Sequence, residues 1–206
     1  MRKILLLLAG PPGTGKTYLA KKVVSVMEDF QLISPDEIKE FYWETEGFKS
    51  LQEKYKLVVK AWRRYYSCLE NGMRNEAMLM SDYPFSLKQK NRLQSLAERY
   101  GYCVITVQLR VRLEVAYQRQ YHRNTDNLRH PGHICSCYYV DCCGNVICTK
   151  DAILSFDEFK EFCIKRDYTG FQLGKLIELD VNDFTQIDYM QFIGEIQDLM
   201  NCNFSK

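Results

Sequence analysis

Short apolar runs alternate with amphipathic stretches along the chain. A buried parallel strand is continuously apolar, and five such runs cover residues 4–9, 30–33, 77–80, 102–109 and 175–179. Stretches with apolar residues at helical spacing cover residues 19–27, 51–73, 86–100, 113–123 and 187–200. This alternation predicts a parallel sheet flanked by helices.

Residues 124–154 show no clear period. The stretch contains five of the nine cysteines and two of the three histidines. A long irregular stretch inside a compact domain is more often functional than idle, and a chain of 206 residues fits one domain. We therefore expect a single domain over residues 1–206, with a lid and an irregular insertion at about 111–154.

The segment from Gly10 to Thr17 reads G-P-P-G-T-G-K-T and directly follows the first apolar run. It matches the phosphate-binding loop, or P-loop, in its usual place between a strand and a helix. The glycines let the backbone amides point at a phosphate, Lys16 can reach the β- and γ-phosphates, and the Thr17 hydroxyl can ligate Mg²⁺. The alternative, a loop that only turns a corner, does not explain the lysine. We expect ATP to contact Pro12, Gly13, Thr14, Gly15, Lys16 and Thr17.

Asp36 lies twenty residues after Lys16, just beyond the second predicted strand. Open α/β sheets bind ligands at the carboxyl ends of their strands. An aspartate there can accept the proton of an attacking hydroxyl, as the general base of a kinase does. The alternative is a helix start, because residues 34–37 read Ser-Pro-Asp-Glu. The two roles are compatible, and we expect Asp36 to be catalytic.

Asp82 ends the third predicted strand. An acidic residue at a strand tip beside a P-loop commonly holds Mg²⁺. The alternative is a turn aspartate before Tyr83 and Pro84. We expect Thr17 and Asp82 to bind Mg²⁺ together with ATP.

Arg119 and Arg123 are four residues apart, so they share one face of a predicted helix. Arginine suits a transferring phosphoryl group because it stays charged and donates hydrogen bonds in a fork. A solvated basic helix face is the alternative. Given the P-loop, we expect both arginines to close over ATP as a lid and to act in catalysis.

Together these motifs resemble P-loop kinases of the polynucleotide 5′-hydroxyl kinase type, and also zeta-toxin-like and chloramphenicol phosphotransferase-like kinases. The resemblance covers about residues 1–125 and rests on the P-loop, Asp36, Ser81-Asp82 and Arg119-x-x-x-Arg123. It implies an AAA-type P-loop ATP-binding domain. We expect a three-layer α/β/α fold whose five-stranded, mostly parallel sheet has the order 2-3-1-4-5.

The resemblance also implies residue roles. Asp36 would be the base, and Arg123 would stabilise the transferring phosphoryl group with support from Arg119. Lys39 stands where polynucleotide kinases carry an arginine that grips the acceptor's phosphate. A lysine supplies the charge but not the fork, so nucleic acid is the less favoured acceptor.

Composition bears on the class of partner and on the cellular compartment. Lys and Arg number 28 against 26 Asp and Glu, so the net charge is close to zero and says nothing about a polyanionic partner. The chain has no run of eighteen apolar residues and therefore no predicted membrane span; we expect a cytoplasmic protein whose cysteines are thiols rather than disulfides. The cysteine spacing over 135–143 matches no recognised zinc knuckle, and a structural metal is the minor alternative.

Basic and aromatic residues are interleaved along the predicted helix 51–73. Such a mixture can bind single-stranded nucleic acid. More often the aromatic side chains face the core and the charges face water, and this is our interpretation.

We therefore expect a phosphotransferase that moves the γ-phosphate of ATP to an acceptor hydroxyl of a small molecule or a nucleic-acid end. The main alternative is an AAA-type ATPase or nucleotide-dependent switch without an acceptor, although Tyr83 rather than an acidic base follows Asp82. A nucleotide-binding module without catalysis is disfavoured by the intact candidate residues. The acceptor and the oligomeric state stay open.

Overall fold

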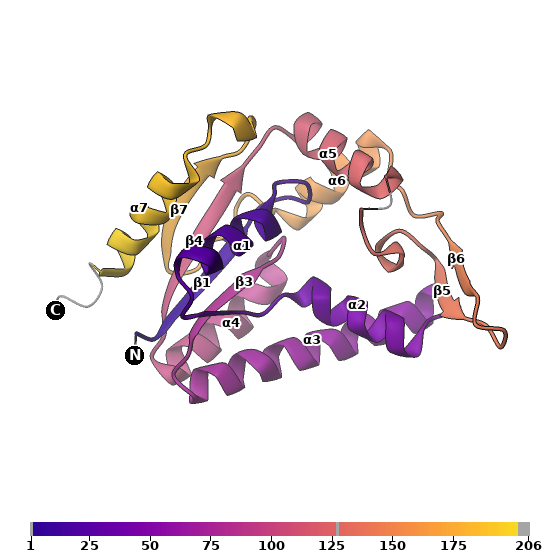
Figure 1. Cartoon of the computed structure of the whole chain (residues 1–206), viewed down its shortest axis with the longest axis horizontal. Coiled ribbons are helices and arrows are strands. Elements are labelled where there is room, and N and C mark those ends of the chain that lie inside the picture. The colour runs from indigo at the N-terminus through magenta and orange to yellow at the C-terminus, as the bar shows by residue number, and fades with distance from the viewer. Residues whose placement is uncertain (1, 127, 202–206) are drawn as a thin grey trace.

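A five-stranded parallel sheet forms the centre of the molecule (Figure 1). The computed structural model describes residues 2–126 and 128–201. The strands of this sheet are β1 (Ile4–Ala9), β2 (Phe30–Leu32), β3 (Met78–Asp82), β4 (Cys103–Arg110) and β7 (Lys175–Asp180). Their order, β2-β3-β1-β4-β7, confirms the predicted order 2-3-1-4-5, with β7 as the fifth strand.

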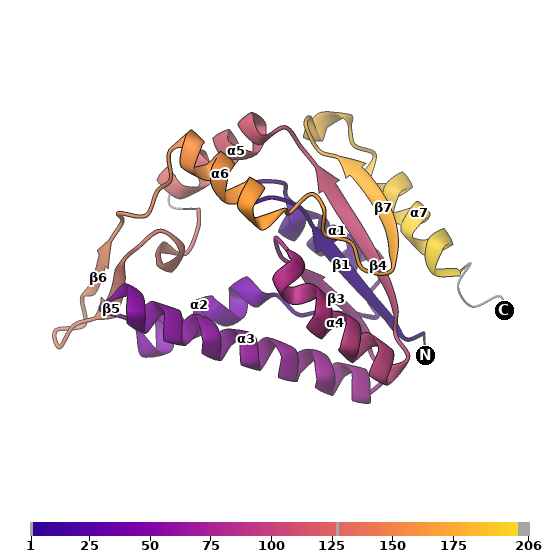
Figure 2. The same ribbon diagram turned by 180° about the vertical axis from the view of Figure 1, so that it is seen from behind.

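Helices cover both faces of the sheet, as the two opposite views show (Figures 1 and 2). One face carries α1 (Lys16–Val26) and α7 (Tyr189–Asn201), and the other carries α3 (Leu51–Arg74) and α4 (Leu87–Tyr100). Strand β1 joins the two layers: its Leu6 packs with α1 and α7, and its Leu7 packs with α3 and α4. Side chains alternate between the faces of a sheet, so a strand buried on both faces must be apolar throughout.

Three further helices are α2 (Pro35–Glu46), α5 (Leu113–Thr125) and α6 (Phe156–Arg166). The apolar spacing predicts α5 but neither α2 nor α6. Each of these two buries few apolar side chains, chiefly Trp43 in α2 and Phe159 in α6. The start of α6 is instead marked by a capping box between Ser155 and Glu158.

A small hairpin unit occupies much of the stretch without a clear period. It contains the 3₁₀ turn η1 (Pro131–His133) and the antiparallel strands β5 (Cys137–Val140) and β6 (Val146–Thr149). The hairpin attaches to the α2–α3 connection, because Phe48 and Tyr138 exchange backbone hydrogen bonds of 2.6 and 2.8 Å. Figure 1 shows the hairpin beside α2 and α3, on the side of the molecule away from α7.

Cys135 and Cys148 form a disulfide. The expectation that the cysteines are thiols is therefore wrong for this pair. The hairpin brings the two Cα atoms to 6.1 Å, and spacing along the chain does not reveal that register. Within residues 2–126 and 128–201, no group of three or more His, Cys, Asp or Glu side chains is arranged to hold a metal ion.

The aromatic residues of α3 divide between core and surface. Tyr65 and Tyr66 are buried in the core beneath β1 and β3, and Trp62 packs against that core. Tyr55, near the start of the helix, is exposed. The interpretation of these aromatics as core residues is confirmed for Tyr65 and Tyr66. Among the described helices, none has the length and apolar character needed to cross a membrane.

We expect Leu6→Ala to lower the free energy of unfolding by about 2–5 kcal/mol, because it opens a cavity at a fully buried position in the sheet. Leu51→Ala is the matched control, since Leu51 is 64% exposed, and it should change stability by about 0.5 kcal/mol or less. Urea unfolding measures both. Equal effects of the two substitutions would contradict the burial of β1.

Candidate active site

The P-loop between β1 and α1 depends on three glycines with positive φ. Gly10, Gly13 and Gly15 have φ of 132°, 87° and 80°, values that other residues rarely adopt. At Gly13 a Cβ atom would also lie 2.3 Å from the carbonyl oxygen of Ala116. This close approach places α5, which carries the predicted lid arginines, directly beside the loop.

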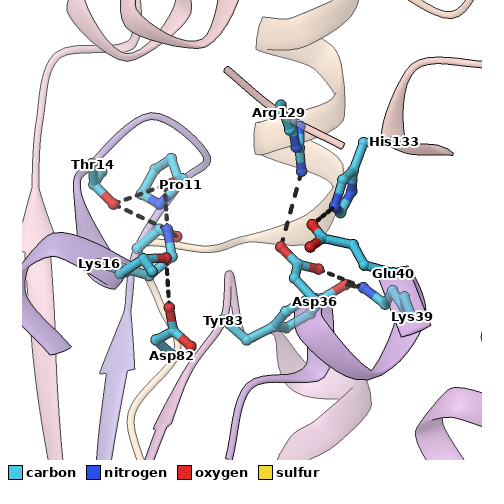
Figure 3. A network of polar contacts seen from close by, with 12 residues as sticks. Pro11, Thr14, Lys16, Asp36, Lys39, Glu40, Asp82, Tyr83, Arg129 and His133 are labelled. Atoms are coloured by element: carbon cyan, nitrogen blue, oxygen red, sulfur yellow. Dashed lines mark hydrogen bonds and ion pairs between the residues drawn. The ribbon is translucent and has the colours of Figure 1, made fainter. Parts of the chain in front are cut away.

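Lys16 is folded back onto the P-loop (Figure 3). Its Nζ donates hydrogen bonds to the carbonyl oxygens of Gly10 and Pro11, at 3.0 and 2.7 Å, and to Thr14 Oγ1 at 3.0 Å. The side chain is buried, and burial lowers its pKa to about 7. An anion that enters the loop would therefore stabilise the charged form of Lys16.

Thr17 and Asp82 form the predicted pair of oxygen ligands. The Thr17 hydroxyl donates to Asp82 Oδ2 at 2.6 Å. Asp82 is 4% exposed, burial raises its pKa, and its Oδ1 has no hydrogen-bond partner among the described residues. A buried, unpaired carboxylate oxygen beside the P-loop threonine is the kind of hard ligand that Mg²⁺ takes, so these two residues fit the ion.

Asp36 lies in the first turn of α2 and is held between two cations (Figure 3). Lys39 Nζ donates to its Oδ1 at 2.9 Å, and Arg129 Nη2 lies 3.9 Å from its Oδ2. Burial alone would raise the pKa of Asp36, but Lys39, His133 and Arg129 lower it well below the usual value. The carboxylate is therefore ionised at neutral pH and directed at these cations.

Residues 129–133 dock on α2 and bring Arg129 to the site. The ring of His133 hydrogen-bonds with Glu40 through Nε2 at 2.7 Å, and Trp43 contacts the rings of His130 and His133. Burial lowers the pKa of His133 to about 4, so the ring is neutral at pH 7. The sequence signal for this docking is the run Arg-His-Pro-Gly-His, whose partner on α2 the sequence does not identify.

The structure separates the two predicted lid arginines. Arg123 lines the same cavity as Lys16, Thr17 and Asp82. Arg119 does not line that cavity: it donates to the carbonyl oxygens of Val181 and Asn182 at 2.6 and 2.8 Å. Its guanidinium also lies 3.7 Å above the ring of Phe184, which covers Gly15.

Two adjoining cavities meet at Asp36 and Arg129. We call the first, about 210 Å³, the P-loop cavity; it is lined by Lys16, Thr17, Asp82 and Arg123. The second, about 230 Å³, is the aromatic cavity and lies between α5, α6 and residues 129–154. Six residues line both, namely Pro12, Asp36, Tyr83, Pro84, Gln120 and Arg129. A ligand in either cavity thus reaches the Asp36 carboxylate.

Comparison with known proteins shows the family and the fold of the chain. A family profile described as an AAA domain matches residues 5–133. No curated protein sequence matches the chain. Among solved structures, a candidate kinase from Chloroflexus aurantiacus has a TM-score of 0.78 at 20% identity, covering 96% of this chain and 98% of that one.

Two further kinase structures superpose over almost their whole length. A gluconokinase from Sinorhizobium meliloti has a TM-score of 0.57 at 10% identity and covers 99% of both chains. A shikimate kinase from Acinetobacter baumannii, in complex with shikimate, has a TM-score of 0.54 at 15% identity, covering 98% of this chain and 96% of that one. At these identities the likeness shows the fold, and it confirms the predicted P-loop α/β architecture.

We expect the affinity for ATP to fall as the pH rises above 7. Bound phosphate favours the charged form of Lys16, whose pKa in the free protein is about 7, so binding takes up a proton. The Kd should rise by up to about tenfold per pH unit between pH 7 and 9. Calorimetry in two buffers of different ionisation enthalpy measures the proton uptake. Lys21→Met, at an exposed position of α1, should keep that uptake, and an absence of uptake at pH 8 in the unaltered protein would contradict the assignment.

Proposed function

The chain belongs to the AAA domain family, and we propose that it is an ATP-dependent kinase that phosphorylates a hydroxyl group of a small-molecule acceptor. The observation that carries this proposal is the position of Asp36 at the boundary of the P-loop cavity and the aromatic cavity. An ATPase needs room beside the γ-phosphate for a water molecule only. A second cavity beside the same carboxylate, with a largely apolar wall, favours an acceptor substrate over the AAA-type ATPase alternative.

On the nucleotide side, the P-loop amides and Lys16 would bind the phosphates. Thr17 and Asp82 would hold Mg²⁺, which neutralises charge on the β- and γ-phosphate oxygens when bound. Lys16 must then exchange its hydrogen bonds to Gly10 and Pro11 for phosphate oxygens. Because its three present partners are neutral oxygens, the exchange replaces neutral acceptors by charged ones and is favourable.

On the acceptor side, Asp36 would orient the attacking hydroxyl and receive its proton. The neighbouring cations keep Asp36 ionised, so it is a weak base before the reaction. A weak base suits a loose phosphoryl-transfer transition state, in which the hydroxyl proton moves late. In such a reaction, orienting the acceptor hydroxyl contributes more to the rate than removing its proton. Arg123 and Arg129, which line the P-loop cavity, would stabilise the charge on the transferring group.

Arg119 has a different role in this proposal. It lies on Phe184 beside Gly15 and is absent from both cavities that meet at Asp36. We assign Arg119 to a contact with a part of the nucleotide other than the γ-phosphate. There it would contribute to the binding of ATP more than to the rate of phosphoryl transfer.

The direct test is transfer of labelled γ-phosphate from ATP to a panel of hydroxyl acceptors. We expect Asp36→Asn to lower kcat at least about 100-fold, because it removes the proton acceptor while keeping the shape of the side chain. Asp29→Asn, at an exposed position before β2, is the matched control and should transfer label like the unaltered protein. Label found only in free phosphate, at a rate that Asp36→Asn leaves unchanged, would instead support the ATPase alternative.

The two arginines of α5 should differ in kinetics. Arg123→Ala should lower kcat by about 1,000-fold or more, as expected for an arginine on the transferring group. Arg119→Ala should raise the KM for ATP about tenfold while kcat changes little, which is typical of lost uniform binding. Steady-state kinetics on both variants separates the roles. A drop of only a few fold in kcat for Arg123→Ala would refute its placement on the phosphoryl group.

A further inference from the structure

The aromatic cavity has an unusual wall away from Asp36. Helix α5, helix α6 and the turn that follows α6 contribute five aromatic side chains: Tyr117, Tyr121, Phe159, Phe162 and Tyr168. The insertion adds four aliphatic side chains: Ile134, Ala152, Ile153 and Leu154. A cavity of about 230 Å³ lies at or below the small end of the usual range for ligand sites. It therefore accommodates a compact molecule built around a single ring.

The charged side chains of this cavity lie at one end only. Among the described lining residues they are Asp36, Lys39 and Arg129, and Asp36 contacts both cations, at 2.9 and 3.9 Å. The fourth titratable group near them, His133, is neutral at pH 7 because burial lowers its pKa to about 4. At the far end a charged group on the ligand would find no oppositely charged side chain among the described lining residues, whereas an apolar ring gains contact with the aromatic and aliphatic wall.

One polar group in the wall lacks a partner. Asn124 is 7% exposed, lines the cavity, and its Oδ1 has no hydrogen-bond partner among the described residues. Leaving a buried acceptor without a donor is costly. A neutral N–H or O–H group on a bound molecule would remove that cost.

We propose, on the basis of the kinase function proposed above, that the phosphoryl acceptor is an uncharged aromatic alcohol. Its hydroxyl lies at Asp36, its ring lies among the aromatic side chains of α5 and α6, and a neutral donor such as an amide reaches Asn124. The acceptor oxygen forms a bond to the γ-phosphorus as the bond from phosphorus to the β–γ bridging oxygen breaks. ADP leaves with that electron pair, and the hydroxyl proton passes to Asp36 and then to solvent.

This assignment separates the acceptor from other hydroxyl compounds. A nucleic-acid end carries phosphodiester charges that no lysine or arginine among the described lining residues of the far wall matches. Arg166 lies over the ring of Phe162 but does not itself line the cavity. Sugar acids and polyamine-like alcohols also carry one or more full charges, for which the far wall offers no oppositely charged lining residue in the part of the chain that the structure describes. A neutral sugar has no such charge but cannot use the aromatic and aliphatic wall as an apolar ring does.

Three probes of similar size differ mainly in their charge. They are 4-(hydroxymethyl)benzamide, 4-(hydroxymethyl)benzoate and 4-(aminomethyl)benzyl alcohol, which share the ring and hydroxyl and carry charges of zero, minus one and plus one. Binding is measured by saturation-transfer NMR with Mg²⁺ and ADP present, and transfer by label from ATP. We expect the neutral probe to bind, and to exceed each charged probe at least about tenfold in kcat/KM. A charged probe that equals the neutral one, or a failure of all three to bind at millimolar concentration, would overturn the proposal.

A lysine placed in the far wall should reverse this preference. Phe162 lines the cavity and is 37% exposed, so Phe162→Lys is compatible with folding. It should improve the benzoate relative to the benzamide at least about tenfold. Ile164→Lys is the matched control, because Ile164 lies on the same helix, is 65% exposed and is not part of the cavity wall; it should leave the ratio unchanged. An unchanged ratio in Phe162→Lys would refute this placement of the ring.

The two proposals fail in different ways. Binding of labelled ATP, and its loss in Lys16→Ala, reports on the kinase function without any acceptor. If ATP binds and label moves to a charged acceptor, only the assignment of an uncharged aromatic alcohol is wrong. If ATP does not bind, the kinase function is wrong, whereas the binding of the three probes still decides what the aromatic cavity prefers.

Discussion

The site depends on one cluster of charges, in which the Asp36 carboxylate lies between the Lys39 ammonium and the Arg129 guanidinium. Removing the carboxylate would leave two neighbouring cations without a counter-charge, whereas removing one cation would leave Asp36 paired with the other. The cluster also joins two parts of the chain, because Lys39 belongs to α2 and Arg129 precedes η1. Asp36 and Arg129 line both cavities, so the cluster lies where the P-loop cavity and the aromatic cavity adjoin.

The sheet and the P-loop could be predicted because their signals are local. β1 has the predicted bounds, residues 4–9, since a strand buried on both faces is visible as an apolar run. The hairpin could not be predicted: its strands are four residues long, Val140 and Val146 are exposed, and its attachment depends on Phe48, about ninety residues earlier. Contacts between distant segments leave no periodic signal in the sequence.

The candidate site residues also divide into those whose position follows from local sequence and those whose position depends on contacts with distant segments. Thr17 and Asp82 meet as expected because the P-loop leads from the carboxyl end of β1 to Thr17, and Asp82 ends the neighbouring strand β3. Arg119 and Arg123 share a helix face, yet Arg119 reaches the Val181 carbonyl while Arg123 lines the P-loop cavity. Long side chains one turn apart can meet different elements, which spacing alone does not reveal. The proposed phosphate site therefore rests on the sheet and its loops, whereas the aromatic cavity is built largely by residues 113–168.

The most direct test of the account is a crystal structure with Mg²⁺ and a non-hydrolysable ATP analogue. We expect the γ-phosphate to lie at the boundary of the two cavities, contacted by Arg123 and Arg129. The space between its phosphorus and the Asp36 carboxylate should hold one hydroxyl oxygen, about 3–3.5 Å from the phosphorus. A γ-phosphate directed away from Asp36, with the aromatic cavity cut off from it, would contradict the account.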